Sequence, residues 1–112
     1  MNENIFNNIK HFDKYGNEYY EARELMEVLE YKEWRNFNNI INKAIAYAKK
    51  NKINLRKHFF KTVKVVQIGT SSRRILNYHL SRYACYLIIK NSNLHNDISL
   101  YGEYYFKKNE TR

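Results

Sequence analysis

Apolar positions along the chain recur at two spacings, which predict a mixture of β-hairpins and helices. Short β-prone segments that flank turns rich in Gly, Asn and Ser predict two hairpins, 9–13 with 18–20 and 59–68 with 73–80. Helical spacing of apolar residues predicts four helices, at 21–30, 34–50, 81–90 and 94–108. The fold class is therefore α+β, a small single domain with two β-hairpins packed on about four helices.

Two of the predicted helices have distinctive faces. In 34–50, one apolar stripe leaves a continuous polar face that we expect to meet solvent or a partner. The helix that follows the expected N-cap Ser81 is apolar around most of its circumference, which predicts a central buried helix. Only a narrow strip on it, with Arg82, Tyr86 and Lys90, is expected at the surface.

Most aromatic residues lie on the predicted apolar faces and are expected in the core: Trp34, Phe37, Phe59, Phe60, Tyr101 and Tyr105. Tyr86, between two cations, is the best candidate for stacking on a nucleobase. The alternative is an ordinary residue at the rim of the core.

The length of 112 residues allows one core, so we expect a single domain over residues 1–112. Cys85 is the only cysteine, which excludes an internal disulfide and favours a reducing cytoplasmic setting. The longest apolar run, 83–89, is too short to cross a bilayer, so no membrane partner is expected.

Charge changes this picture most. The net charge is +9, yet residues 35–96 carry thirteen Lys and Arg and no acid, whereas the first 34 residues hold eight acids and four bases. A codon bias could enrich Asn, Lys and Tyr, but it would not remove Asp and Glu from so long a stretch. The acid-free stretch therefore predicts a polyanionic partner, with DNA or RNA favoured.

Within this stretch, the candidate contacts are cations that can neutralise phosphate and amides that can hydrogen-bond to adenine. They lie on the polar face of 34–50 and in the second hairpin: Arg35, Asn39, Asn42, Lys43, Lys49, Lys50, Lys61, Lys64, Arg73 and Arg74. We expect two or three converging patches. The alternative is a surface that only keeps the protein soluble and in which codon bias has enriched Asn and Lys.

The helix at 21–30 has the opposite character. Its expected solvent side carries Glu24, Glu27 and Glu30, a possible face for a protein partner. Acids there argue against a helix-turn-helix in which this helix crosses the phosphate backbone.

No motif in the chain predicts catalysis. The four histidines lack metal-ligand spacing, and Cys85 lies among apolar neighbours. We therefore expect no enzyme activity, no metal site and no cofactor.

Three segments carry a resemblance: 19–25, 29–37 and above all 80–88, with the string LSRYACYLI. They resemble the N-terminal region of the damage-inducible protein D family, which is similar to the BRO-N domains of phage and viral proteins, including phage antirepressors. The resemblance implies an α+β domain associated with nucleic-acid binding and, for damage-inducible protein D, modulation of the RecA filament.

The chain departs from that pattern at several positions. Glu30 stands where relatives commonly have Gly, Asn77 where they have Asp, and Ser92-Asn93 where Gly-Asp is usual. The resemblance also implies that the C-terminal region usual in the family is lacking here.

Two functions follow as hypotheses. The first is a non-enzymatic module from a phage, mobile element or DNA-damage response that binds nucleic acid or a nucleoprotein. The alternative is a small phage-type inhibitor that blocks a host nucleoprotein machine through protein contacts: the RecA filament, a repressor, or a CRISPR effector as an anti-CRISPR. A homo-oligomer formed through Leu100 and Tyr104 is compatible with either.

Overall fold

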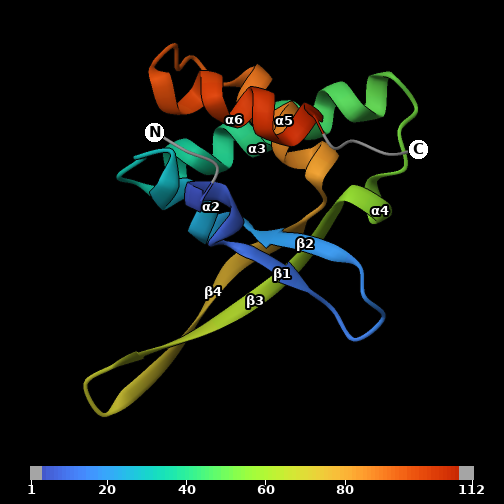
Figure 1. The fold of residues 1–112 in the computed structure, drawn as a ribbon. Helices are drawn as coiled ribbons and strands as arrows, with labels where there is room; N and C mark the ends of the chain where they lie inside the picture. The colour runs from blue at the N-terminus through green and yellow to red at the C-terminus, as the bar shows by residue number, and fades with distance from the viewer. Residues whose placement is uncertain (1–3, 109–112) are drawn as a thin grey trace.

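The computed structural model describes residues 4–108 (Figure 1). Its sheet has four antiparallel strands in the order β1-β2-β4-β3. The strand bounds are β1 Lys10–Phe12, β2 Glu18–Glu21, β3 Phe59–Ile68 and β4 Ser71–Leu80. Both predicted hairpins are confirmed. The sequence did not show that they join into one sheet, in which Tyr20 pairs with Leu80 and Glu21 with His79.

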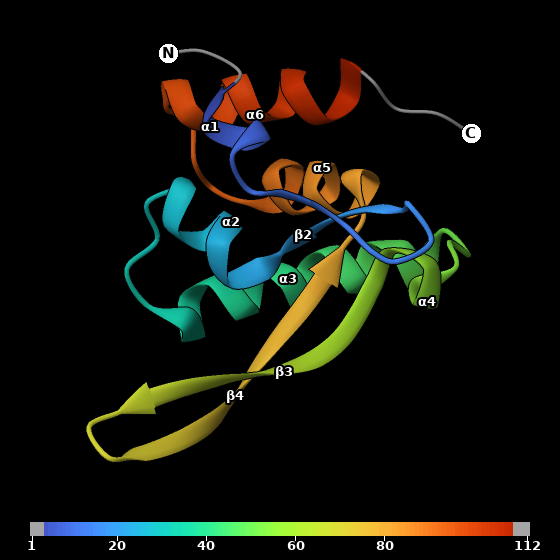
Figure 2. The same ribbon diagram turned by 60° about the horizontal axis from the view of Figure 1, so that its bottom comes forward.

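Strands β3 and β4 pair along their whole length, from Phe59 opposite Leu80 to Ile68 opposite Ser71. Strand β2 reaches only the last two residues of β4. The rest of the β3–β4 hairpin, residues 61–78, is here called the ribbon. Its root packs on the domain, where Asn77 and Tyr78 are buried, and its outer part, residues 65–74, extends away as a twisted two-stranded arm (Figures 1 and 2).

The four expected helices are present as α2 Ala22–Val28, α3 Trp34–Lys50, α5 Arg82–Asn91 and α6 Asp97–Lys108. The expected start of the last helix at Leu94 is wrong. Asn96 caps α6 instead, because its Oδ1 accepts the Ser99 N–H at 2.9 Å. Two single-turn helices, α1 Asn4–Asn7 and α4 Leu55–His58, were not predicted, since four residues give no periodicity.

Helix α5 is the buried centre of the helical layer, as predicted. It lies between α3 and α6 (Figure 2), and its buried residues are Ala84, Cys85, Leu87, Ile88 and Ile89. The Ser81 hydroxyl accepts the Ala84 N–H at 3.0 Å, which confirms the predicted cap.

Gly102 explains how α6 comes so close to its neighbours. A Cβ at this position would lie 2.8 Å from Cδ1 of Ile89 and 2.9 Å from Cζ of Phe6. Glycine inside a helix costs about 1 kcal/mol relative to alanine. Here it is required by the contact of α6 with α5 and α1.

Helix α2 obtains its N-terminal cap from a distant strand. The side chain of Glu21 makes no capping bond, whereas Oδ1 of the buried Asn77 on β4 accepts the Arg23 N–H at 3.1 Å. Arg23 also donates from Nε to the Leu76 carbonyl at 2.9 Å, and its guanidinium lies 3.9 Å from the centroid of the Trp34 ring. These contacts fix α2 and the start of α3 against the root of the ribbon.

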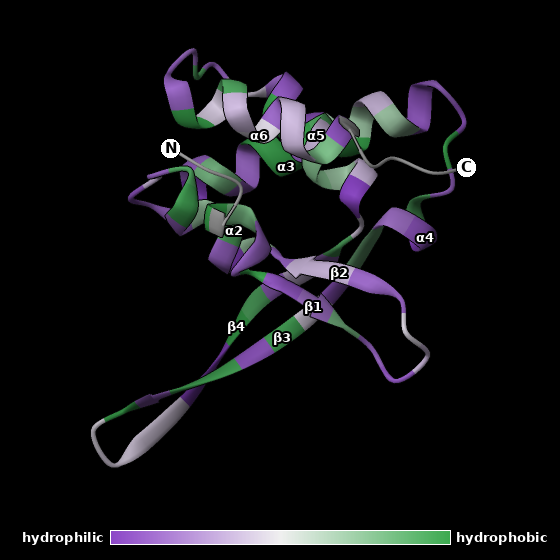
Figure 3. Ribbon diagram, in the orientation of Figure 1, coloured by the Kyte–Doolittle hydropathy of each residue, from purple (hydrophilic) through white to green (hydrophobic). Residues whose placement is uncertain are grey.

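The apolar core gathers where the helices face one another and the sheet (Figure 3). Phe37, Phe59 and Tyr105 are buried as expected, and Trp34 and Tyr101 are half-buried. The expectation for Phe60 is wrong, because its side chain is 60% exposed. Adjacent strand residues point to opposite faces, so the burial of Phe59 sends Phe60 to the outer face of the sheet.

Candidate nucleic-acid interface

Helix α3 presents the polar face that its sequence predicted. The predicted contacts on this helix are all exposed: Arg35, Asn39, Asn42, Lys43, Lys49 and Lys50. Within residues 4–108, none of the four cations among them forms an ion pair, and the helix contains no acid. The face is therefore a solvated cationic surface whose charges are free to meet phosphate.

The ribbon divides its four predicted cations between its two faces. Lys61 shares one face with Arg74, which lies opposite Val65, while Lys64 shares the other with Arg73, which lies opposite Val66. Lys61, Arg73 and Arg74 are exposed. Lys64 is less available than predicted, because its ammonium lies 3.4 Å from Oε1 of Glu21.

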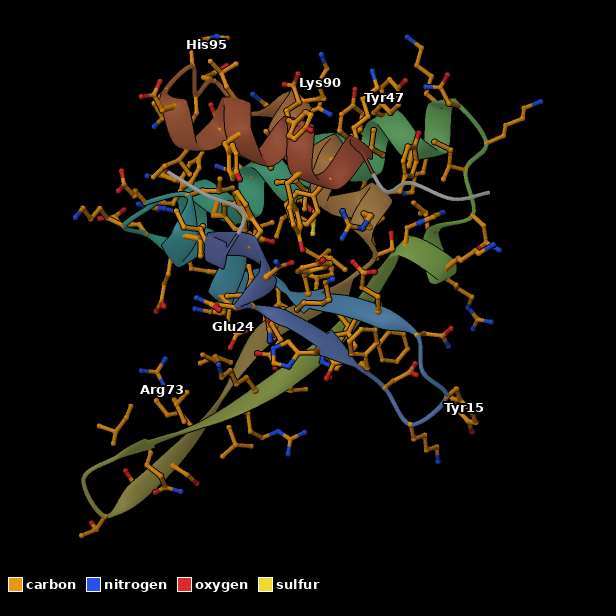
Figure 4. All side chains as sticks on the ribbon, viewed as in Figure 1. Tyr15, Glu24, Tyr47, Arg73, Lys90 and His95 are labelled. Carbon is orange, nitrogen blue, oxygen red and sulfur yellow. The ribbon has the colours of Figure 1, made fainter. Side chains whose placement is uncertain are left out.

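The expected convergence of the basic patches does not hold between the outer ribbon and the C-terminal half of α3. The ribbon extends away from the helical layer, so that Arg73 lies far from Tyr47 on the C-terminal half of α3 (Figure 4). The direction of a hairpin beyond its sheet depends on twist and packing, which local sequence does not specify. The outer ribbon and the C-terminal half of α3 are therefore two separate cationic surfaces.

A third basic region was only partly anticipated. Arg56 and Lys57 of α4 are exposed and border a hollow between α4 and the β1–β2 turn. This hollow is also lined by the rings of Tyr19, Phe60 and His79 and by two acids, Asp13 and Glu18. Rings from all four strands form a row across this outer face: centroids lie 5.2 Å apart for His11–Tyr19, 4.3 Å for Tyr19–His79 and 6.3 Å for Phe60–His79. Local sequence patterns do not predict this row, because it depends on the register of the four strands.

A second hollow lies at the exposed side of α3, beside the α5–α6 loop. Tyr31, Asn36, Asn39, Ile40, Lys43, Asn93 and Leu94 line this site, here called the amide hollow. Sequence analysis singled out Asn39 and Lys43 as contacts. Their proximity to Asn93 was not predicted, because Asn93 lies in a loop at least fifty residues further along the chain.

The expected acidic partner face is smaller than predicted. Oε1 of Glu24 lies 2.7 Å from Nε2 of His11, and both side chains are half-buried, so placing Glu24 on a free face was wrong. Glu27 and Glu30 are exposed.

The same contact forms the one group of side chains suited to a metal within residues 4–108. Ligand atoms of His11, Glu21 and Glu24 lie within 4.8 Å of one another. Glu21 already bonds to Lys64 and to the Asn77 amide, each at 3.4 Å. A divalent cation would therefore have to displace Lys64.

Arg82 is an internal residue, which corrects its expected place on a surface strip. Its side chain is 10% exposed and donates to Glu18 Oε2 at 2.9 Å, to the Tyr105 carbonyl at 2.6 Å and to the Tyr20 hydroxyl at 3.2 Å. Burial lowers the pKa of Arg82, but the neighbouring Tyr20 and Glu18 outweigh it and raise the pKa. Arg82 is thus committed to the core and unavailable to phosphate.

Tyr86, the predicted stacking residue, is half-buried on α5. Cys85 is buried, and burial raises the pKa of its thiol, so this cysteine has the properties of an unreactive core residue. Across the described part of the chain, every helix falls short of the length and apolarity that crossing a membrane requires.

The chain is 33% identical over 109 residues to DNA damage-inducible protein D of Escherichia coli (strain K12), an alignment that covers 95% of this chain and 40% of that relative. The chain thus spans less than half the length of the relative it matches. No solved structure gives a significant match. Residues 8–105 match the sequence model of the BRO family, N-terminal domain, and the chain therefore belongs to this family.

Proposed function

We propose that this domain is a non-enzymatic DNA-binding module whose ribbon enters a groove of the duplex. The observation that carries the proposal is the ribbon itself: a protruding two-stranded arm with two cations on each face and no acid in its sequence. The outer part of this arm, residues 65–74, buries no side chain and therefore adds little to the stability of the fold.

The dimensions and chemistry of DNA fit this arrangement. The major groove, about 12 Å wide, admits a two-stranded β-ribbon and is bordered on both sides by phosphates. Lys61 and Arg74 would face one border, while Arg73 and Lys64 would face the other. Val63 and Val65 are exposed on the same face as Lys61 and Arg74, and they offer apolar contact of the kind that thymine methyl groups accept.

The cationic face of α3 supplies a second contact. Arg35, Lys43, Lys49 and Lys50 are exposed and unpaired within residues 4–108, so binding phosphate would not require breaking internal ion pairs. Lys64, in contrast, must first leave Glu21. We therefore expect the ribbon arginines and the α3 cations to dominate the affinity.

Fluorescence anisotropy with a labelled duplex about two helical turns long tests the proposal. If about five phosphates are neutralised, log K against log salt should have a slope of about −4 to −5. The double variant Arg73→Ala/Arg74→Ala should weaken binding about tenfold or more and flatten that slope by about 2.

The matched control is Lys32→Ala/Lys107→Ala, which removes the same charge from exposed positions outside the acid-free stretch. Its affinity should stay within about threefold of the unmodified protein. Equal losses in the two double variants would show that only net charge matters, and the ribbon would then have no special part in binding.

Absence of binding to duplex DNA at low salt would overturn the proposal. The alternative, inhibition of a nucleoprotein machine such as a RecA filament, a repressor or a CRISPR effector, would then gain support if a partner protein were retained after nuclease treatment. Charge reversal of Glu27 and Glu30 would show whether the remaining acidic face of α2 contributes to that contact.

A further inference from the structure

We propose that the amide hollow recognises the edge of an adenine base. This inference rests on the proposed nucleic-acid binding, but it concerns a site on α3 and the α5–α6 loop that is separate from the ribbon. It adds a base preference to an interface that cations alone would make insensitive to sequence.

Three amide side chains converge on this hollow. Asn36 and Asn39 are three residues apart on α3 and are therefore neighbours on one helix face. Asn93 lines the same hollow from the α5–α6 loop. All three residues are exposed, and within residues 4–108 none of their side chains forms a hydrogen bond. Each amide thus has a free donor and a free acceptor.

The loop side of the hollow is held in place by its own hydrogen bonds. The Ser92 hydroxyl donates to the Ile89 carbonyl at 2.8 Å and accepts the Leu94 N–H at 3.4 Å. Tyr31 also lines the hollow, and burial raises the pKa of its phenol. A ligand would therefore meet a largely preformed wall, which reduces the entropy lost on binding.

The other lining residues suit a base attached to a phosphate chain. Ile40 is buried, and Tyr31 and Leu94 are half-buried, so together they form an apolar surface against which a base can pack. Lys43 lies one turn after Asn39 at the exposed side of the hollow and has no ion pair in the described chain. Its ammonium is free to contact phosphate.

The donor and acceptor pattern selects adenine. The N6 amino group and N7 of adenine present one donor beside one acceptor, which one asparagine amide can satisfy with two bonds. Guanine presents two acceptors, O6 and N7, and is matched by an arginine fork or a lysine. Amides outnumber cations three to one in this hollow.

The adenine could belong to a duplex, to a single strand or to a free nucleotide, and the experiment distinguishes these three sources. Anisotropy would be measured with equal-length duplexes whose centres are A·T or G·C, with single-stranded oligo-dA and oligo-dC, and with AMP as a competitor. We expect about a tenfold preference for the adenine-containing probe of at least one pair. A duplex preference indicates reading in a groove, and a single-strand preference indicates an unpaired base.

The matched variants are Asn39→Ala and Asn8→Ala. Both residues are exposed asparagines, but only Asn39 lines the hollow, and Asn8 lies in the turn before β1, outside the candidate interface. Asn39→Ala should abolish the adenine preference, and Asn8→Ala should retain it. Alanine is a strong helix former, so Asn39→Ala on α3 is expected to fold.

The outcomes distinguish the inference from the proposed function. Tight binding of all probes without an adenine preference, or equal effects of the two variants, overturns the inference and leaves the DNA-binding proposal intact. Direct binding of AMP that requires Asn39, measured by isothermal titration calorimetry, without affinity for any polymer, supports the adenine site and overturns the DNA-binding proposal.

Discussion

Two residues with left-handed backbones close the C-termini of helices α2 and α3. Glu30 has φ 68° and Lys52 has φ 59°. In each case the next residue bonds back across the last turn: the Tyr31 N–H to the Met26 carbonyl at 3.0 Å, and the Ile53 N–H to the Ala48 carbonyl at 2.9 Å. This is the Schellman motif, in which glycine is the favoured residue.

Glu30→Gly should therefore stabilise the protein. A left-handed conformation costs a non-glycine residue about 1–2 kcal/mol, part of which the greater freedom of glycine in the unfolded chain offsets. We expect a net gain of about 0.5–1 kcal/mol in the free energy of unfolding, measured by urea denaturation. Glu27→Gly, which removes an exposed acid within the helical turns of α2, should cost about 1 kcal/mol. A lower midpoint for Glu30→Gly would contradict this account.

At this scale, the sequence predicted exposure well only where periodicity alone decides it. The polar residues of α3 are exposed because one helix face is apolar, which the sequence displays directly. Arg82 and Glu24 were misplaced because their partners are distant along the chain, Glu18 by 64 residues and His11 by 13. A charged residue that binds so distant a partner has the same local pattern as one on the surface.

Among the elements, local signals located both hairpins and the four longer helices. They failed where a boundary depends on a single side chain, as at Asn96, or where an element is one turn long, as in α4. The joining of β2 to β4 rests on two residue pairs, Tyr20 with Leu80 and Glu21 with His79, and no local pattern predicts it. The candidate interface was therefore predicted as a set of residues, and its division into separate surfaces was not.

The β1–β2 turn has a defined dependence on pH. Oδ1 of Asp13 accepts the N–H groups of Tyr15 and Asn17, each at 2.9 Å, and the bond from Asn17 is the main reason that the pKa of Asp13 lies below its ordinary value. Because the folded pKa is depressed, the ionised carboxylate stabilises the fold above the ordinary pKa, and this contribution is lost as pH falls through the folded pKa.

Asp13→Asn should therefore lower the melting temperature near pH 7, and its difference from the unmodified protein should shrink below about pH 4. Thermal unfolding between pH 7 and pH 3 measures this difference. Glu33→Gln is the control, since Glu33 is exposed and its side chain makes no capping bond to α3. A difference for Asp13→Asn that stays constant over this range would show that charge on Asp13 plays no part in holding the turn.

The whole molecule consists of a folded body and a projecting ribbon. Its extents are 43 × 32 × 28 Å, and the ribbon projects beyond the body in both ribbon views. None of residues 65–74, the outer part of the ribbon, is buried. Six of the seven acids in residues 4–34 lie in or beside β1, β2 and α2, and Glu33 precedes α3, whereas the acid-free stretch forms the ribbon, α3, α4 and α5. Charge and shape therefore both point to the ribbon as a structure maintained for a partner.

Shortening the ribbon should separate folding from binding. Lys64 and Ile75 are opposite each other in the sheet, so replacing residues 65–74 by Asn-Gly would close a two-residue hairpin without changing the register of the root. The deleted residues contribute no buried side chain, so the melting temperature should change by less than about 5 °C. Affinity for duplex DNA should fall about tenfold or more, since Arg73 and Arg74 are lost together with the surface that carries them.

The comparison with Arg73→Ala/Arg74→Ala defines what the ribbon contributes. If the shortened protein binds more weakly than the double variant, the backbone and apolar side chains of the ribbon contribute contacts beyond charge, as insertion into a groove requires. If it folds and keeps full affinity, the ribbon is no part of the interface, and the cations of α3 and α4 must account for binding. Failure of the shortened protein to fold would mean that the outer ribbon belongs to the cooperative folding unit. That result would contradict this account, because residues that bury nothing should contribute little to the free energy of unfolding.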